Sequence, residues 1–149
     1  MTEQIEYRHS IPIQIRFNDV DPQGHVNNSV YFSFYDLGKT SYFRKVAEWD
    51  LDKIKVGIVA AHISADFLAP LKGHEPVAVQ TAVTEIGHKS FKLVQQLINT
   101  ENQEIKCICT SVMVAFDTLE QHAVEMPEDW KSAICAFEGK DLNRKKEGL

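Results

Sequence analysis

Between Ser29 and Trp49 the chain reads SVYFSFYDLGKTSYFRKVAEW. This stretch contains no proline and no cluster of turn residues, which predicts a single long helix. Its apolar residues recur all around the helical wheel and do not form one stripe. A helix that is hydrophobic on nearly every side is usually buried. We therefore expect a sheet that wraps around this helix.

Stretches with a period of two lie on both sides of the helix. Ile11 to Phe17 alternates between apolar and polar residues, as a strand with one buried face does. Four further runs predict strands joined by short connections: Gly57–Leu68, Val77–Ile86, Ser90–Thr100 and Ile105–Asp117. A last helix is expected after Pro127, where apolar residues recur at helical spacing. The pattern predicts an α+β domain with an antiparallel sheet.

The length and charge of the chain limit its organisation and its partners. Its 149 residues fit one domain over residues 1–149, with a polar, flexible tail from Gly139 to Leu149. The net charge of -5 argues against sequence-independent binding of nucleic acid. No run approaches the roughly 18 apolar residues that span a membrane, and the first ten residues do not resemble a signal peptide. We expect a cytoplasmic protein with neither nucleic-acid nor membrane partners.

The three cysteines predict neither a disulfide framework nor a metal site. Cys107 and Cys109 are separated by one residue, and this spacing in a strand places both thiols on one face. Such a pair is too constrained for an ordinary disulfide. The chain contains no CxxC pair and no His-x-x-x-His, so zinc has no support. We expect reduced, buried cysteines and no bound metal.

The polar loop from Asn18 to Asn28, NDVDPQGHVNN, carries the densest set of chemically active side chains. It leads into the amino terminus of the long helix, where free N–H groups and the helix dipole favour negative charge. A carboxylate near such donors stays ionised. The combination suits hydrolysis of an activated ester: the donors polarise the carbonyl while the carboxylate attacks it or activates water.

Three other interpretations of this loop need no catalysis. Asp19-x-Asp21-x-Gln23-Gly24 resembles the start of a calcium-binding loop, but Val30 stands where the bidentate glutamate is required. In a plain connecting loop, the Asp and Asn side chains serve as caps of the helix. His25 is, on the same view, an ordinary loop histidine.

The residues of the loop also resemble a known family. They form the motif Arg16-Phe17-x-Asp19-x-Asp21-Pro22-x-Gly24-His25-Val26-Asn27-Asn28-x-x-Tyr31. This motif is similar to the signature of the 4-hydroxybenzoyl-CoA thioesterase-like hotdog family, in the His-Val-Asn-Asn branch that includes plant acyl-carrier-protein thioesterases. The resemblance continues in three later segments: Tyr31-x-x-Phe34-x-Asp36, Ser64-Ala65-Asp66-Phe67-Leu68-x-Pro70-Leu71 and Gly87-His88-Lys89-Ser90-Phe91.

The resemblance implies a hotdog fold and assigns roles to the loop. It implies five or six antiparallel strands around the helix, with sheets paired edge to edge in a homodimer or homotetramer. Asp21 takes the place of the catalytic carboxylate, as general base or nucleophile. Backbone N–H groups from Asn28 to Tyr31 would hold the thioester oxygen, and Gly24 would allow close approach. His25 is a second-rank catalytic candidate, because its position also matters for catalysis in the plant-like branch. Gln23 stands where that branch carries Asn, which weakens a direct transfer of its mechanism.

The same resemblance names substrates and binding residues. The substrate would be a thioester of coenzyme A or acyl carrier protein, in fatty-acid metabolism, with no further cofactor. Lys89 and Ser90 resemble a turn that contacts the coenzyme A phosphates, although a turn lysine is often merely solvated. The acyl pocket is expected between the helix and the next strand, near Phe34, Tyr35, Leu37 and Phe67. Asp36 needs a partner or a role on this apolar helix, as a structural or a substrate-binding group.

Thioester hydrolysis to free acid and thiol is the function that the sequence favours. A hotdog enoyl-CoA hydratase is disfavoured, because that class has a wider Asp–His spacing with Asn-Pro between them, whereas Pro22 directly follows Asp21. A non-catalytic acyl-CoA-binding domain stays open as an alternative from another class.

Overall fold

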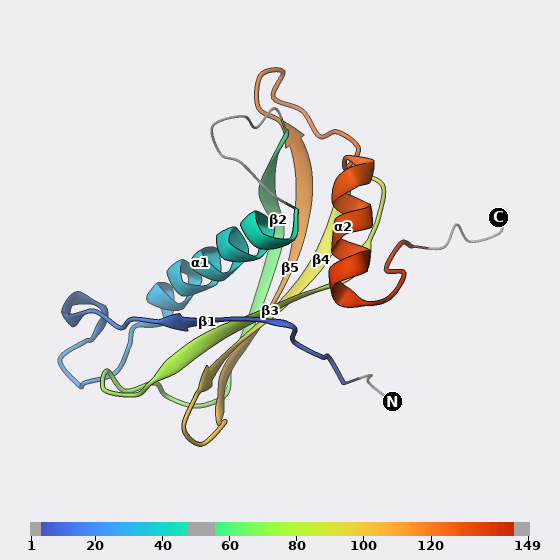
Figure 1. Cartoon of the computed structure of the whole chain (residues 1–149). Helices are drawn as coiled ribbons and strands as arrows, with labels where there is room; N and C mark the ends of the chain where they lie inside the picture. Colours follow the sequence, from blue (N-terminus) through green and yellow to red (C-terminus); the bar gives the residue numbers. More distant parts are fainter. Residues whose placement is uncertain (1–3, 48–55, 145–149) are drawn as a thin grey trace. The chain divides into compact units, whose positions relative to one another are not determined.

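The long helix and the strands predicted from the sequence are present, together with a short 3-10 turn. The computed structural model describes residues 4–47 and 56–144. Its elements are, in chain order, β1 (His9–Ile13), η1 (Phe17–Asp19), α1 (Asn28–Val46), β2 (Val56–Phe67), β3 (Val77–Ile86), β4 (Ser90–Asn99), β5 (Ile105–Asp117) and α2 (Glu128–Glu138) (Figure 1). Residues 48 and 49, at the end of the predicted helix, lie outside the described residues.

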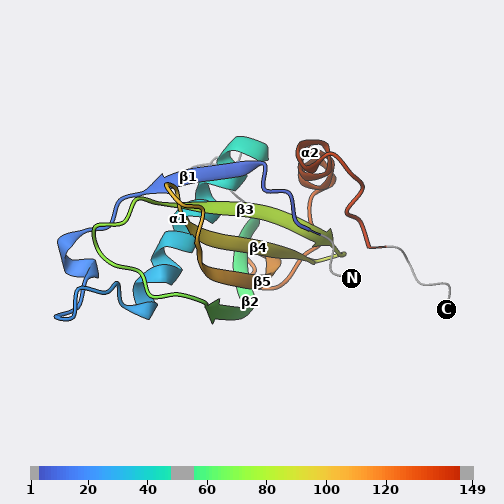
Figure 2. The same ribbon diagram turned by 90° about the horizontal axis from the view of Figure 1, so that it is seen from below.

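The strands form one sheet in the order β1-β3-β4-β5-β2 (Figure 2). Strands β3, β4 and β5 are neighbours both in sequence and in the sheet, as hairpin-length connections require. The two edges of the sheet are β1, which precedes α1, and β2, which follows it. The predicted fold class, α+β with a long helix and an antiparallel sheet, is confirmed with five strands in the described part of the chain.

Strand β1 differs from its prediction at both ends. It spans His9 to Ile13, whereas the alternation predicted residues 11–17. The pairing with β3 explains the early end, because Ile13 lies opposite Val77 and β3 begins at Val77. Beyond Ile13 no residue of β3 is left to pair with. Pro12 lies on this edge strand, where a missing N–H is tolerated.

Packing divides the chain into two units. The first comprises Met1–Tyr42, Ala65–Ala82 and Gln95–Cys109, and the second comprises Phe43–Ser64, Val83–Val94 and Thr110–Leu149. The expectation of a single domain over residues 1–149 stays a prediction.

In the first unit, one face of α1 packs on the sheet. The buried core consists of apolar side chains from the helix, from four strands and from the segments that flank them: Ile13, Val26, Tyr31, Phe34, Tyr35, Leu71, Val77, Val79, Leu97, Cys107 and Cys109. Gly38 allows a close approach, because a Cβ there would lie 2.7 Å from Val79 Cγ1. The opposite face of α1 is open in the described chain, with Leu37 56% exposed. The helix is therefore buried on one side, whereas the sequence predicted burial on nearly every side.

In the second unit, α2 ends at a glycine cap and the following residues run along the end of β3. Gly139 has a φ of 76°, and its N–H donates to Cys135 O at 2.9 Å. The N–H of Ile86 donates to Leu142 O, and that of Arg144 donates to Ile86 O. Residues 139–144 of the predicted flexible tail thus have hydrogen-bonded partners, and residues 145–149 lie outside the described chain. In the part of the chain that the structure describes, neither helix is long and apolar enough to span a membrane.

Candidate active site

The polar loop between β1 and α1 folds into a short hairpin. Val20 pairs with Val26 in an isolated antiparallel bridge, and the N–H of Asp21 donates to His25 O at 2.8 Å. The Gly24 N–H donates to Asp21 O at 2.9 Å and closes the turn. Gly24 has a φ of 83°, a region that residues with a Cβ rarely adopt. Within the described chain, a Cβ at Gly24 would meet nothing within 4 Å, so the backbone conformation explains this glycine.

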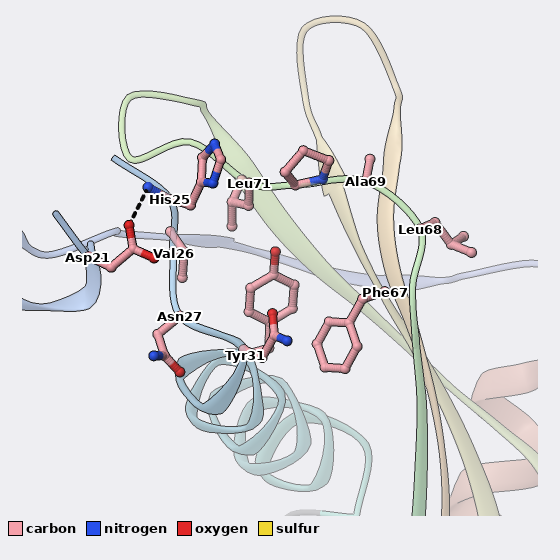
Figure 3. A pocket seen from close by; sticks show the side chains of 11 residues that line it. Asp21, His25, Val26, Asn27, Tyr31, Phe67, Leu68, Ala69 and Leu71 are labelled. Carbon is pink, nitrogen blue, oxygen red and sulfur yellow. Dashed lines mark hydrogen bonds between the residues drawn. The ribbon is translucent and has the colours of Figure 1, made fainter. Parts of the chain in front are cut away.

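The Asp21 carboxylate is held in one orientation by two backbone donors. Its Oδ1 accepts the N–H of Gln23 at 2.9 Å. The same oxygen accepts the N–H of His25 at 3.1 Å (Figure 3). Its Oδ2 accepts no hydrogen bond from any residue that the structure describes. Asp21 is partly buried and lines a cavity. A fixed carboxylate with one unused oxygen can take a proton from water or attack a carbonyl.

Asp19, two residues earlier, has a different environment. It is buried, and both of its carboxylate oxygens accept hydrogen bonds from the Arg16 guanidinium, at 3.0 and 3.3 Å. These hydrogen bonds hold the pKa of Asp19 below its usual value. Its backbone O also accepts the Asn27 N–H at 3.2 Å. Asp19 therefore closes the base of the loop.

The amino terminus of α1 is capped by Asn27, which confirms the capping interpretation for this residue. Asn27 Oδ1 accepts the backbone N–H of Ser29 at 2.9 Å and the Ser29 hydroxyl at 2.8 Å. The Val30 N–H donates to Asn27 O at 3.0 Å. Among the described residues, the Asn28 N–H has no hydrogen-bond acceptor. An unused N–H at the positive end of a helix dipole favours a bound oxyanion.

A cavity of about 380 Å³ lies between this loop, the start of α1 and the segment after β2 (Figure 3). It is lined by Asp21, His25, Val26, Asn27, Asn28, Tyr31, Phe67, Leu68, Ala69, Pro70 and Leu71. The rings of Tyr31 and Phe67 meet edge to face with centroids 5.3 Å apart. Burial raises the pKa of the Tyr31 hydroxyl, so this group stays protonated at neutral pH. The cavity thus combines a carboxylate, a helix terminus and two aromatic rings.

Five of the residues predicted for the site line this one cavity, and they include both the carboxylate and the expected helix start. They are Asp21, His25, Asn28, Tyr31 and Phe67. Gly24 belongs to the adjoining turn.

Other residues predicted to contact substrate lie away from this cavity. Phe34 and Tyr35 are buried in the core, and Leu37 is exposed. Asp36 is exposed and forms an ion pair with Lys39 at 3.7 Å. The partner that a carboxylate on this helix requires is therefore a lysine one turn away.

Lys89 and Ser90 belong to the second unit, at the turn between β3 and β4. The Gly87 N–H donates to Ser90 O at 2.7 Å and closes this turn. Lys89 is exposed and makes no ion pair within the described chain, whereas Lys92 and Arg144 both pair with Glu85. Lys89 is therefore available to an anion, and its role in substrate binding stays a prediction.

The other wall of the cavity was not predicted from the sequence. Residues 68–71 form this wall, and the carbonyl of Leu71 accepts the Val26 N–H at 2.8 Å. The only signal for this segment was its place in the family resemblance. In residues 4–47 and 56–144, no three His, Cys, Asp or Glu side chains are arranged to hold a metal ion, and the cysteines there form no disulfide.

The profile of the thioesterase-like superfamily matches residues 15–134, which include the loop, the helix and the sheet strands β2 to β5. The chain belongs to the thioesterase-like superfamily. The resemblance to hotdog thioesterases and the hotdog fold that it implied are both confirmed.

Relatives of this superfamily member are distant but cover most of its length. The acyl-CoA thioester hydrolase YbgC of Escherichia coli O6:H1 is 23% identical over 128 residues, which are 85% of this chain and 92% of the relative. A Thermus thermophilus thioesterase, solved with coenzyme A and zinc, has a TM-score of 0.81 at 26% identity, covering 91% and 98% of the two chains. The PA5185 protein of Pseudomonas aeruginosa has a TM-score of 0.82 at 24% identity, covering 93% and 95%.

Proposed function

We propose that this superfamily member hydrolyses acyl thioesters of coenzyme A to a free acid and a thiol. One observation carries the proposal: Asp21, whose carboxylate is fixed by two backbone N–H groups, lines the same cavity as Asn28, whose N–H has no acceptor among the described residues. This arrangement supports a base or nucleophile and an oxyanion donor that act on one substrate. The names of the relatives, acyl-CoA thioester hydrolase and thioesterase, support the same reaction.

In the proposed reaction, the Asn28 N–H polarises the thioester carbonyl, and the helix dipole adds to its effect. Asp21 Oδ2 either removes a proton from water as it adds to the carbonyl carbon, or attacks that carbon itself. In both routes the C–S bond breaks, and the thiolate leaves and is then protonated. In the first route the hydroxyl of the water molecule ends in the acid product. In the second route the acyl group is first bound to Asp21 as an anhydride, and a water molecule then hydrolyses this anhydride to the free acid and the regenerated carboxylate. His25, on the same cavity wall, is the second candidate for proton transfer.

Separate contacts are proposed for the acyl group and for the coenzyme A phosphates. The acyl group would contact Tyr31 and Phe67, whose rings give the cavity its aromatic wall. Lys89 is the proposed contact of the coenzyme A phosphates. Acyl carrier protein is kept as an alternative carrier. The cytoplasmic location and the place in fatty-acid metabolism also remain proposals.

We further propose that the chain works as a homodimer or homotetramer paired along β2. This strand is an edge of the sheet, so one row of its backbone groups faces no other strand in the described chain. Val59, Ile63 and Phe67 recur on it at a spacing of four and are all exposed. Exposed apolar edge strands associate readily.

The decisive experiment measures thiol release from short, long and aromatic acyl-CoA esters by the wild type and by Asp21→Asn. We expect Asp21→Asn to lower kcat by about 10²–10⁴-fold, the usual contribution of a general base, with substrate binding retained. Asp129→Asn is a matched control, because it makes the same chemical change at an exposed carboxylate of α2.

Three results would overturn the proposal or part of it. Turnover of Asp21→Asn near the wild-type rate would remove Asp21 from the chemistry. Stoichiometric binding of acyl-CoA without release of thiol would favour a binding domain. Hydration of an enoyl-CoA without release of thiol would favour a hydratase.

A further inference from the structure

Lys106 is a buried lysine on β5 that is not among the residues lining the cavity. Its side chain is 5% exposed, and its Nζ lies 2.8 Å from Glu75 Oε1. It also pairs with Glu104 and donates to the backbone O of Pro70 at 3.2 Å. Removing two charges from water is costly unless each charge gains several partners. The partners of Lys106 show what this ion pair does.

The side chains of Lys106 and Glu75, together with the Lys106 backbone, bind the segment that follows β2. The backbone O of Lys106 accepts the N–H groups of Leu68 at 2.9 Å and Ala69 at 3.2 Å. Glu75 Oε2 accepts the Lys72 N–H at 2.7 Å. Together with the bond to Pro70, four bonds fix the backbone between residues 68 and 72.

The same segment also binds the loop between β1 and α1, which contains Asp21. Val26 donates to Leu71 O at 2.8 Å, and the N–H of Gly73 donates to Gly24 O at 3.2 Å. His25 pairs with Lys72 in an isolated bridge. The N–H of His25 is in turn one of the two donors that orient the Asp21 carboxylate.

We propose that Lys106, with Glu75, is a positioning residue for thioester hydrolysis: it fixes the wall of residues 68–72 and, through it, the backbone that orients Asp21. This inference rests on the proposed function. Lys106 does not touch the reacting atoms and acts only through hydrogen bonds. Displacing a catalytic group by about 1 Å can cost about 10²-fold in rate, so a loosened wall should reduce kcat.

The test separates positioning from simple loss of stability. Lys106→Met removes the cation and leaves the buried Glu75 carboxylate without its charged partner. The double variant Lys106→Met/Glu75→Gln removes both charges, so it keeps the test valid where the single variant fails to fold. Lys106→Arg keeps the charge and should recover part of kcat. Lys131→Met is the matched control, because Lys131 is also largely buried and paired with a glutamate, in the second unit.

We expect the folded double variant to lose at least about tenfold in kcat, on the scale of such misplacements, with a smaller change in KM. The Val26 amide should also exchange its hydrogen faster, a readout that needs no substrate. Wild-type kcat and unchanged Val26 exchange in the double variant would overturn the positioning role, even if Asp21→Asn remains inactive. An inactive wild type with faster Val26 exchange would instead overturn the proposed hydrolysis alone.

Discussion

The Glu75–Lys106 pair should make the unfolding free energy of the protein depend on pH between about pH 5 and pH 2. Glu75 is 12% exposed. Burial opposes its ionisation, but hydrogen bonds from Lys106, from the Lys72 backbone and from Asn99 outweigh this effect. They lower the pKa of Glu75 from its ordinary 4.5 to about 2. Glu75→Gln is the perturbation of choice, because it imitates the neutral acid at every pH.

The size and sign of the effect follow from this lowered pKa. The folded protein binds the proton of Glu75 less readily than the unfolded chain does, so ionisation of Glu75 stabilises the fold. The change from 4.5 to about 2 corresponds to about 3 kcal/mol of unfolding free energy. This contribution is complete above about pH 5, falls to roughly half near pH 3 and is almost gone at pH 2.

The assay is urea unfolding followed by circular dichroism from pH 7 to pH 2, at one fixed protein concentration because association changes apparent stability. The quantity of interest is the difference in unfolding free energy between the wild type and Glu75→Gln. We expect this difference to shrink by about 3 kcal/mol as the pH falls. Glu101→Gln, an exposed glutamate of the turn after β4, serves as the control. A difference that is the same at pH 7 and pH 2 would refute the reasoning.

Three further predictions test the edge strand, the carrier contact and the core. Ile63→Lys should reduce the mass of the proposed oligomer in light scattering, and an unchanged mass would place the interface elsewhere. Lys89→Gln should raise KM about two- to fivefold for acyl-CoA, as loss of one exposed ionic contact does, but not for acyl-pantetheine, which lacks the nucleotide phosphates. Gly38→Ala should lower unfolding free energy by about 1–3 kcal/mol, because its Cβ would lie 2.7 Å from Val79 and 2.8 Å from Gln95. Unchanged stability of Gly38→Ala in urea would contradict that close approach.

Elements defined by local signals were predictable, and those that depend on a distant partner were not. Strands β3 and β5 have the predicted bounds, because alternation and turn residues mark both ends in the sequence. The end of β1 was wrong, because it depends on where β3 begins. The exposed face of α1 was not predicted, for a related reason. When apolar residues occur all around a helix, the sequence does not indicate which of its faces packs on the sheet.

The part of the candidate site that lies in the loop between β1 and α1 was predictable from the sequence. The polar density near Asp21 and the family resemblance both lie in the local sequence. The wall of residues 68–71 comes from a segment far along the chain and joins the loop through the bond from Val26 to Leu71. Lys106 gave no signal, because strand alternation places it on the face opposite Cys107, where a lysine is expected in solvent. Glu75 and Pro70, both distant in sequence, supply the partners that explain its burial.

The loop between β1 and α1 also explains why several interpretations of one sequence were hard to separate. The capping interpretation is correct for Asn27, and Asp19 is occupied by Arg16. Structural carboxylates and amides use their oxygens on the protein itself. Asp21 differs because two backbone N–H groups fix one oxygen while the other accepts no hydrogen bond in the described chain. A general base or nucleophile needs this combination of fixed orientation and an unused lone pair. Asp21 is therefore distinguished by the carboxylate oxygen that its neighbours in the loop leave without a hydrogen bond. The spacing of residues in the sequence does not reveal this difference.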